Sequence, residues 1–370
     1  MESSETVPRK PPMLDERNRF KLGVFGLNVS GGFSCTAAEG RLKGGDWNEV
    51  KRLALQAEAA GFDALIPIAR WKGFGGATNW NDLCFETFTW AAGLAAITER
   101  IQVFATVHVP TVHPVRAAKE AVTVDHISGG RFGLNLVAGW NASETRMFGE
   151  AERSHDERYK VADEFATLLK RLWTEDTFDF DGEYFQVPAA HSAPQPIQRP
   201  HPVLMGAGGS PAGSDFAARH ADIQFLNLQT LDGAADIVAA IKRNALEKYG
   251  RDIKVMTCVY VICRETEREA RDYFNHVARE KGDMEAAANM VNALAPTTSF
   301  QVLPEVLEHV CAGFGAIPLI GTPEQIVATM QVLADAGLDG ATVSWVNYGE
   351  GIEQYRQMLL PLLRQAGLRA

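Results

Sequence analysis

Short apolar runs alternate with longer amphipathic stretches along the whole chain. Eight runs have the length and apolar character of buried strands: 21–27, 64–68, 101–106, 132–137, 203–206, 223–228, 254–262 and 340–346. Between them Ala, Leu and Glu recur at helical spacing, for example over 47–60, 117–126 and 232–248. This alternation predicts a parallel sheet, and eight units predict a closed (β/α)8 TIM barrel. An open doubly wound sheet would carry GxGxxG after its first strand, where this chain has NVSGG over residues 28–32.

The size of the chain fits one large barrel. It has 370 residues, of which 46% are hydrophobic and 22% are charged, so a large core can form. Because barrels often reach about 250 residues or more as one unit, we expect a single domain over residues 1–370. The first residues are polar, and we expect residues 1–18 to be flexible.

Two segments depart from the plain repeat and predict insertions after strands 4 and 7. Residues 178–185 alternate around Asp181-Gly182, which predicts a hairpin with a two-residue turn. Residues 281–318 form a long segment of low charge, which predicts a lid-like loop. After it, Thr322, Pro323 and Gln325 predict a helix that begins with a capping box.

Charge and cysteine content narrow the class of protein. The net charge of −10 argues against nucleic acid as a partner, because phosphate binding needs clustered Lys and Arg. No apolar run approaches the ~20 residues of a membrane helix. The five cysteines form no CxxC pair, so neither a disulfide framework nor a zinc site is indicated. We expect a cytoplasmic protein that binds neither nucleic acid nor membranes.

The segment after the fifth strand has the features of a phosphate-binding turn. Residues 206–211 read GAGGSP, in which Ser210 is a good N-cap and Pro211 suits the first helical turn. A helix N-terminus at the carboxyl rim of a barrel is a natural phosphate cup. An ordinary capped loop would have the same residues. Arg158 and Tyr159 fall early on the preceding helix, where they either pair with a phosphate or form a solvated Arg beside a packing Tyr.

Polar residues also occur where the third and fourth strands end. Asn135 lies inside an apolar strand and needs partners if it points into the barrel, and Thr106 is in a similar position. Trp140 either walls a planar ligand or packs in the core. His108 is able to donate to a substrate, although such a residue more often packs or faces water. Each of these four residues has a structural explanation as well as a functional one.

Other sites of chemistry are not indicated. No HExxH or other paired metal spacing occurs, so we expect no metal. No GxSxG elbow is present either, and this lack of an evident nucleophile favours cofactor chemistry. The motif DHISGGR over residues 125–131 precedes strand 4 and therefore lies at the bottom of the barrel. We interpret Gly129-Gly130 there as a helix C-cap and turn.

Taken together, the chain resembles the bacterial-luciferase-like flavin monooxygenases, and within them the pyrimidine oxygenases and the dimethylsulfone and alkanesulfonate monooxygenases. The resemblance covers nearly the whole chain. The most specific stretches are residues 72–76, 86–89, 92–96, 127–140, 155–159 and 208–210. The resemblance implies a TIM barrel, reduced FMN supplied by a separate flavin reductase, dioxygen as co-substrate, and a homodimer or homotetramer.

The resemblance also implies roles for individual residues. It places flavin contacts at Ala69, Arg70, Asn135, Glu144, Arg158, Tyr159 and Ser210. Thr106 and Asn135 match positions that line the oxygen pocket of the pyrimidine oxygenase, and we take them as the catalytic pair. His108 and Trp140 remain candidates for substrate contact. His108 stands where that oxygenase has a small residue, so the substrate need not be uracil.

The substrate class follows from an absence of positive charge. Between Lys281 and Arg356 the chain has no Lys or Arg, whereas the sulfonate enzymes of this family rely on an Arg in that insertion. We therefore predict a small neutral substrate, such as a cyclic amide or a sulfone, that is cleaved at a carbon–heteroatom bond. The alternatives are an alkanesulfonate monooxygenase, a deazaflavin-dependent hydride transferase, a non-catalytic flavin-binding protein and a metal-dependent barrel lyase.

Overall fold

The computed structural model describes residues 10–294 and 303–370, and in this part of the chain eight parallel strands close into a barrel. The barrel strands are β1 (Lys21–Phe25), β2 (Ala64–Ile66), β3 (Gln102–His108), β4 (Phe132–Val137), β7 (Val203–Ala207), β8 (Ile223–Leu226), β9 (Lys254–Cys263) and β11 (Gly340–Ser344). They pair in chain order, and β9 and β11 close the ring between β8 and β1. The predicted (β/α)8 barrel is confirmed.

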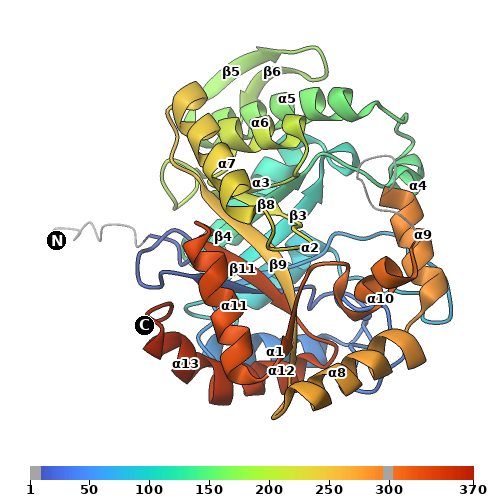
Figure 1. Ribbon diagram of the computed structural model, residues 1–370. Helices are drawn as coiled ribbons and strands as arrows, with labels where there is room; N and C mark the ends of the chain where they lie inside the picture. Colours follow the sequence, from blue (N-terminus) through green and yellow to red (C-terminus); the bar gives the residue numbers. More distant parts are fainter. Residues whose placement is uncertain (1–9, 295–302) are drawn as a thin grey trace.

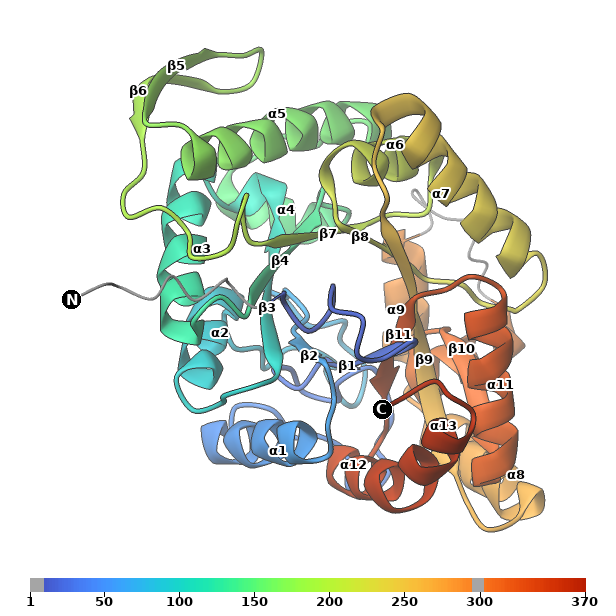
Figure 2. The same cartoon turned by 90° about the vertical axis from the view of Figure 1, so that its left-hand side faces the viewer.

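Helices surround this ring of strands (Figure 1 and Figure 2). The helices that cover the barrel are α1 (Trp47–Ala59), α2 (Thr87–Ala95), α3 (Pro114–Ser128), α5 (His155–Thr174), α6 (Pro211–His220), α7 (Ala234–Tyr249), α11 (Pro323–Asp335), α12 (Tyr348–Gln354) and α13 (Leu360–Gln365). Local sequence sets their ends. Thr322 and Gln325 form the predicted capping box of α11, and Gly129 ends α3 in the left-handed conformation, as predicted.

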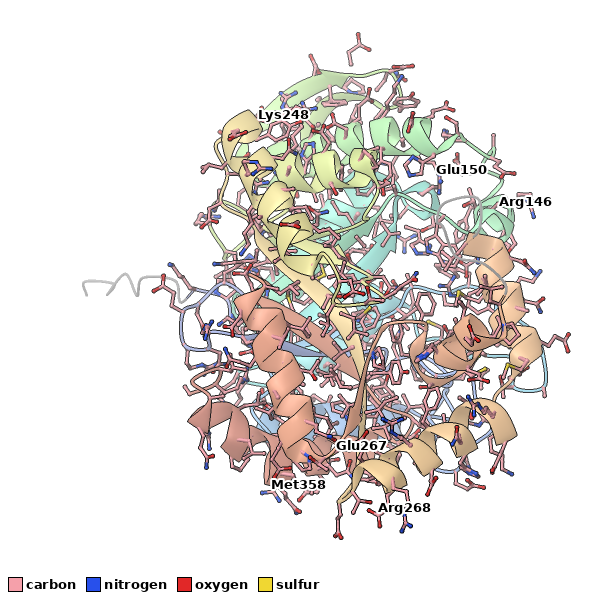
Figure 3. The ribbon with its side chains drawn as sticks, viewed as in Figure 1. Arg146, Glu150, Lys248, Glu267, Arg268 and Met358 are labelled. Carbon is pink, nitrogen blue, oxygen red and sulfur yellow. The ribbon has the colours of Figure 1, made fainter. Side chains whose placement is uncertain are left out.

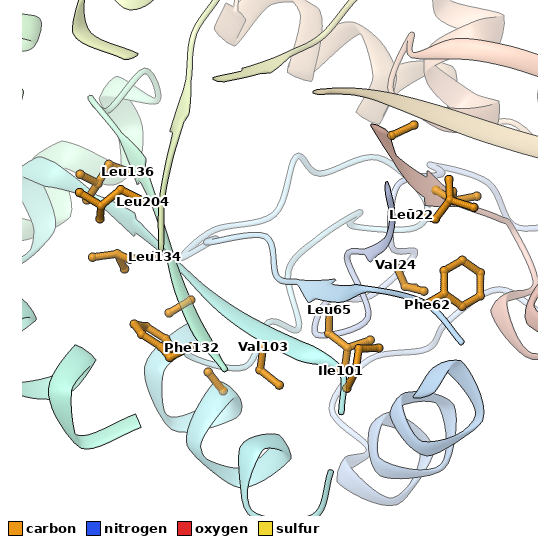
Figure 4. Packing of buried hydrophobic residues seen from close by; sticks show 14 of the residues in the cluster. Leu22, Val24, Phe62, Leu65, Ile101, Val103, Phe132, Leu134, Leu136 and Leu204 are labelled. Atoms are coloured by element: carbon orange, nitrogen blue, oxygen red, sulfur yellow. The ribbon is translucent and has the colours of Figure 1, made fainter. Parts of the chain in front are cut away.

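Alternate residues of each strand build two apolar layers. Val103, Leu134 and Leu204 point outward and pack with other buried side chains against the helices (Figure 4). Phe104 and Met205 belong to the inner cluster, which fills the barrel. The ring of Phe104 takes the space beside Gly133, where a Cβ would lie 2.4 Å from its Cε1. The barrel is therefore a packed core with room for chemistry only at its rim.

The segment after β9 is helical where we predicted a loop. It contains α8 (Glu267–Asn275), a π-helical turn (His276–Glu280), α9 (Met284–Leu294) and α10 (Pro304–Gly313). The prediction of a loop over 281–318 was wrong for α9 and α10. The charge is low because α9 buries one face, including Met290 and Val291, while residues 295–302 lie outside the described part of the chain.

A ninth strand, β10 (Ile317–Gly321), joins the sheet beside β9 and was not predicted. It pairs with Val259 to Cys263, the half of β9 that extends beyond its partner β8. β10 thus ends the excursion that α8 begins. Figure 1 shows α9 and α10 on the same side of the barrel as the short helix α4 (Ala142–Thr145), which directly follows β4.

The predicted hairpin after strand 4 forms, with a longer turn than expected. It consists of β5 (Thr177–Asp181) and β6 (Gln186–His191), and it projects beyond α5 (Figure 2). Asp181 pairs with Gln186, so the turn spans residues 182–185 and the two-residue turn was wrong. The carboxylate of Glu164 on α5 explains the longer loop, because it accepts from the N–H groups of Glu183, Tyr184 and Phe185.

The start of the chain is partly packed against the barrel. Residues 1–9 of the segment predicted to be flexible lie outside the described part. In the rest of it, Met13 is 1% exposed and its N–H donates to Gln102 Oε1 at 3.0 Å. Asn18 is also buried and donates to Asp63, so parts of this segment contact the barrel, and the flexibility expected of residues 1–18 stays a prediction.

The periphery carries charged side chains. Arg146 and Glu150 near α4, Lys248 on α7 and Arg268 on α8 project outward in Figure 3. No helix in the described ranges combines the length and the apolar character that spanning a bilayer requires.

Candidate active site

The loops at the carboxyl ends of the barrel strands bring the predicted site residues into two neighbouring groups. One group contains Ser210, in the turn after β7, with Arg158 and Tyr159 of α5. The other lies at the ends of β2, β3 and β4 and contains Ala69, Arg70, Thr106, His108, Asn135, Trp140 and Glu144. Gly139 links them, because its carbonyl accepts a hydrogen bond from Arg158 Nη1.

The turn after β7 has the geometry expected of a phosphate cup. Ser210 caps α6 and its Oγ accepts from Gly213 N–H at 3.1 Å. The hydroxyl of Tyr159 lies against the turn, since a Cβ on Gly208 would sit 2.4 Å from it. A Cβ on Gly209 would meet only Leu226, at 3.7 Å. Since Pro211 has no N–H and the Gly213 N–H bonds Ser210 Oγ, Ala212 is left to supply an N–H of the first turn, and Gly209 leaves the backbone before the helix uncrowded.

Arg158 completes this first group. Its side chain is half-buried, and burial lowers its pKa. Burial also raises the pKa of Tyr159, which a hydrogen bond with Ser210 and the charge of Arg158 partly oppose. The Nε–H of Arg158 is buried without a partner among the described residues. A buried donor costs free energy unless it is satisfied, so Arg158 is a candidate ligand for an anion beside the turn.

Asn135 and Thr106 are partners in neighbouring strands. They are in register, and Asn135 Nδ2 donates to Thr106 Oγ1 at 3.2 Å. The Thr106 hydroxyl in turn donates to the Pro67 carbonyl at 2.7 Å. The Oδ1 atom of Asn135 is buried and has no donor among the described residues. The pair thus offers one fixed acceptor at the barrel mouth, which suits a ring N–H.

Arg70 and Glu144 form a buried ion pair at the rim. Glu144 Oε2 lies 3.2 Å from Arg70 Nη1, and the side chains are 4% and 1% exposed. Glu144 Oε1 accepts from the N–H groups of Trp71 and Lys72, at 2.8 and 3.2 Å. Because its oxygens are engaged by protein donors, Glu144 shapes the loop after β2 and holds Arg70 in place.

His108 shares the same carboxylate. Its Nδ1 lies 3.7 Å from Glu144 Oε2. Burial lowers the pKa of His108 to about 4; Glu144 opposes this shift, and Arg70 adds to it. The imidazole is therefore neutral near pH 7. A nearby thiol is also unreactive, because burial raises the pKa of Cys84 to about 12.

Aromatic rings cover the guanidinium of Arg70. Its Cζ lies 4.9 Å from the ring centres of both Phe74 and Trp140, whose planes are nearly parallel at 13°. Trp140, predicted to wall a ligand or to pack, thus packs on Arg70. Trp71 and Phe148 form a second aromatic pair, with centres 5.0 Å apart and both partly exposed. These contacts fix Arg70 by cation–π interactions and shield its ion pair.

A cavity of about 160 Å³ opens beside this group. Ala69, Arg70, Thr106 and His108 line it. Residues at or near the starts of α2 and α3 also line it, namely Thr87, Phe88, Val112, Arg116 and Glu120. Arg116 and Glu120 pair at 2.8 Å, so both arginines that line the cavity already have carboxylate partners. The cavity is small and mostly neutral.

Two residues that position the backbone of the site were not identified from the sequence. Asn28, after β1, accepts from Ile68 N–H at 2.9 Å and donates to the Ile68 carbonyl at 2.7 Å. It thereby fixes the backbone that leads to Ala69 and Arg70. Thr87 donates to the Thr106 carbonyl at 2.7 Å. A polar residue directly after a strand was the available signal for Asn28, and Thr87 carried none.

The glycine motif before strand 4 is structural, as interpreted, since Gly129 caps the end of α3. Arg131 donates to the carbonyls of Ala95, Thr98 and Ile101 and thus closes the end of α2. Asp125 accepts from Gln198 Nε2 and from the N–H of Ile197. Both residues lie at the amino ends of the strands, far along the barrel from the rim. Among the described residues, no group of three or more His, Cys, Asp or Glu is placed to hold a metal ion.

Comparisons with known proteins point to one family and one fold. The model of the luciferase-like monooxygenases matches residues 21–340. An FMNH2-dependent dimethylsulfone monooxygenase of Pseudomonas putida is 33% identical over 355 residues, which cover 93% of this chain and 95% of that protein. Pyrimidine monooxygenase RutA of Acinetobacter baylyi is 31% identical over 325 residues, with 85% and 86% covered. The crystal structure of riboflavin lyase RcaE superposes with a TM-score of 0.85 at 23% identity, covering 95% and 93%, which is a likeness of fold.

Proposed function

The chain belongs to the luciferase-like monooxygenase family, and on that basis we propose that it oxygenates a small neutral molecule at a carbon–heteroatom bond. It is an FMN-dependent monooxygenase that uses reduced FMN and dioxygen, and a separate reductase supplies the reduced flavin. When bound, reduced FMN supplies the two electrons with which one oxygen atom of O2 is transferred to the substrate and the other is reduced to water. The residues of this chain bind, orient and shield.

The observation that carries the proposal is the open cup after β7. The buried Nε–H of Arg158 lacks a partner among the described residues, and Tyr159, its neighbour on α5, lies against the capped N-terminus of α6. A phosphate monoester bound there would accept a charge-assisted hydrogen bond from a guanidinium and a hydrogen bond from an N–H of the first helical turn. We propose that Arg158, Tyr159 and Ser210 hold the FMN phosphate.

The remaining proposed contacts lie at the ends of β2, β3 and β4. Asn135 Oδ1 is an acceptor without a donor among the described residues, which suits an N–H of the flavin ring. Thr106 orients Asn135 and lines the cavity with Ala69 and Arg70, whereas Asn135 is not part of the cavity lining. We propose that Glu144 contributes indirectly, because Arg70 and the backbone of Trp71 and Lys72 occupy its oxygens.

Water must be kept from the reacting groups for oxygen transfer to compete with loss of peroxide. We propose that α9 and α10 act as a fixed cover on one side of the rim. Asp283 accepts from the N–H and hydroxyl of Thr78, at 2.6 and 2.7 Å, and Asn289 donates to the Phe74 carbonyl at 2.8 Å. These bonds tie the cover to the loop after β2.

Pairing of the site arginines favours a neutral substrate over a sulfonate. Arg70 pairs with Glu144 and Arg116 with Glu120, and no Lys or Arg occurs between Lys281 and Arg356. An anionic substrate in a closed cavity needs an unpaired cation. The described lining offers none, so an alkanesulfonate is the less favoured substrate.

The test combines flavin binding with isotope transfer. Ser210→Ala and Arg158→Met should each weaken FMN binding about tenfold or more, since each removes a phosphate contact. Arg146→Met is the matched control, because Arg146 lies nearby but projects outward (Figure 3). Fluorescence titration measures the affinity. Unchanged affinity in both variants would refute the phosphate site.

Catalysis is tested with a flavin reductase, NADH and 18O2 over a panel of neutral heterocycles, amides and sulfones. The expected result is a product that carries one 18O atom and requires the protein. A deazaflavin in place of FMN should give no oxygenated product. Peroxide alone from every compound, at the rate seen without protein, would contradict the proposed activity.

A further inference from the structure

Gln224 on β8 is a buried amide in an otherwise apolar layer, and it is 0% exposed. Ile223 and Phe225, on either side of it, pack in the inner cluster, whereas Leu226 belongs to the outer one. Because side chains alternate along a strand, Gln224 points outward, toward the covering helices. A buried amide costs free energy unless it is hydrogen-bonded, so its partners indicate what it does.

The amide nitrogen of Gln224 joins the two sides of the turn after β7. Nε2 donates to the Gly208 carbonyl at 3.1 Å and to the Ser214 hydroxyl at 2.9 Å. Gly208 precedes the cap of α6, and Ser214 is the fourth residue of that helix. A carbonyl oxygen only accepts, so the contact with Gly208 fixes which end of the amide faces the turn. Oε1 has no donor among the described residues, so the bonds that the Gln224 amide makes there all go to the turn.

A second side chain contacts the same turn from another element. The hydroxyl of Tyr159 lies where a Cβ on Gly208 or on Gly213 would fall, at 2.4 and 2.6 Å. Tyr159 comes from α5 and is partly exposed, whereas Gln224 comes from β8 and has no accessible surface. A ligand at the turn can therefore reach Tyr159 directly, while Gln224 acts on it only through the backbone of the turn.

We propose that Gln224 is a positioning residue for the phosphate of FMN, an inference that rests on the phosphate site proposed above. Its two hydrogen bonds fix the backbone of Gly208 relative to α6, so the turn and the N–H of Ala212 are in place before a phosphate arrives. A site that is formed in advance loses less conformational entropy on binding. Without Gln224 the phosphate itself must order the turn, so affinity for the phosphate falls while the contacts of the flavin ring are unchanged.

Riboflavin isolates this contribution, because it has the ring and the ribityl chain of FMN but no phosphate. The ratio of the riboflavin Kd to the FMN Kd, from fluorescence titrations of the full-length protein, measures what the phosphate adds to affinity. Gln224→Met keeps the approximate length and volume of the side chain and removes its hydrogen bonds. We expect this variant to lower the ratio about fivefold or more, the equivalent of one lost hydrogen bond. Its riboflavin Kd should stay within about twofold of wild type, because the ring site is separate from the turn.

Gln198 is the matched control, at the amino end of the barrel. It is 5% exposed, and its Nε2 donates to Asp125 Oδ1 at 2.6 Å and to the Phe132 carbonyl at 2.8 Å. Its Oε1 also lacks a partner in the described ranges. Gln198→Met therefore removes bonds of the same kind away from the turn, and it should lower Tm but leave the ratio unchanged. Ser214→Ala removes one bond of Gln224 and should lower the ratio about twofold, which covers the case in which Gln224→Met does not fold.

The outcomes separate this inference from the proposed function. A wild-type ratio in folded Gln224→Met, or an equal fall in Gln198→Met, would overturn the positioning role. An equal loss of affinity for riboflavin and FMN would also overturn it, because the effect would then not concern the phosphate. If the ratio falls in Ser210→Ala but not in Gln224→Met, only this inference fails and the phosphate site stands. A ratio near one in the wild type would remove the phosphate site, and this inference with it.

Discussion

Arg131 and Arg70 stand at opposite ends of the barrel and differ in what they leave unpaired. At the amino end, Arg131 donates to the carbonyls of Ala95, Thr98 and Ile101 and to the Thr98 hydroxyl. At the carboxyl rim, Arg70 has one carboxylate partner, two aromatic neighbours and a buried N–H with no acceptor among the described residues. Arg131 uses its guanidinium to bond the fold, whereas Arg70 has an N–H that bonds no described residue.

This difference separates residues that serve the fold from residues that serve a ligand. Asn135 and Arg158, also at the rim, each keep one buried polar atom without a partner in the described chain. Unsatisfied buried groups are costly, so these rim atoms are candidate contacts for a bound molecule; unpaired buried atoms also occur away from the rim, for example Arg369 Nε beside Asp63. Substitutions at the two ends should therefore affect different measurements.

The largest effect is expected at the amino end. Arg131→Met removes four hydrogen bonds from a charged donor and should lower the free energy of unfolding by about 4 kcal/mol. Urea unfolding followed by tryptophan fluorescence measures the loss. FMN affinity of the folded variant should stay within twofold of wild type. If the free energy of unfolding falls by less than about 1 kcal/mol, or if the FMN affinity changes by much more than twofold, Arg131 does not have the purely structural role expected of the amino end.

The burial of His108 at the rim should make the free energy of unfolding depend on pH. Burial lowers the pKa of His108 to about 4 in the folded protein, against about 6.5 in the unfolded chain. Between these values the unfolded chain binds a proton that the folded protein refuses, so stability falls as pH is lowered from about 6.5 to about 4. The loss should reach about 3 kcal/mol and be absent in His108→Gln. The free energy of unfolding is measured against pH for the wild type and for His108→Gln. If the two curves stay parallel between pH 6.5 and pH 4, the burial argument is contradicted.

The third comparison pairs two amides of the barrel interior. Asn135→Leu should lower kcat/KM about 100-fold, because a fixed polar group at the reacting centre is lost, with stability changed by less than about 1 kcal/mol. Gln102→Leu, at the amino end, is the control. Gln102 bonds the N–H of Met13 and the carbonyl of Phe132, so this change should reduce stability and spare activity. Equal effects of both variants on activity would remove the distinction.

The fold was largely predictable from the sequence because each barrel strand is a short apolar run between amphipathic helices. β10 was missed since it contains Pro318 and pairs on one side only, where a proline is tolerated and the apolar pattern is weak. α9 was mistaken for part of a loop because burial of one face removes the charges that usually mark a surface helix.

The site was predictable where its signal is local. Ser210 and Pro211 identify the start of α6 from neighbouring residues alone. The pair of Arg70 and Glu144 spans 74 positions, and no local pattern joins such residues; only the family resemblance pointed to them. Which polar atoms stay unpaired depends on packing in three dimensions, so no sequence pattern indicates that Arg70 Nε and Asn135 Oδ1 lack partners among the described residues.

The strand β10 also bears on how such an enzyme diversifies. The excursion leaves β9 at Cys263 and returns at Ile317, the register neighbour of Val259. Its two ends are thus anchored side by side on one ladder, and closure entropy grows only slowly with the length of chain between them. The segment between these two strands can therefore change in sequence or length while the eight barrel strands keep their register. New substrate specificities can evolve in this way without a change in the barrel itself.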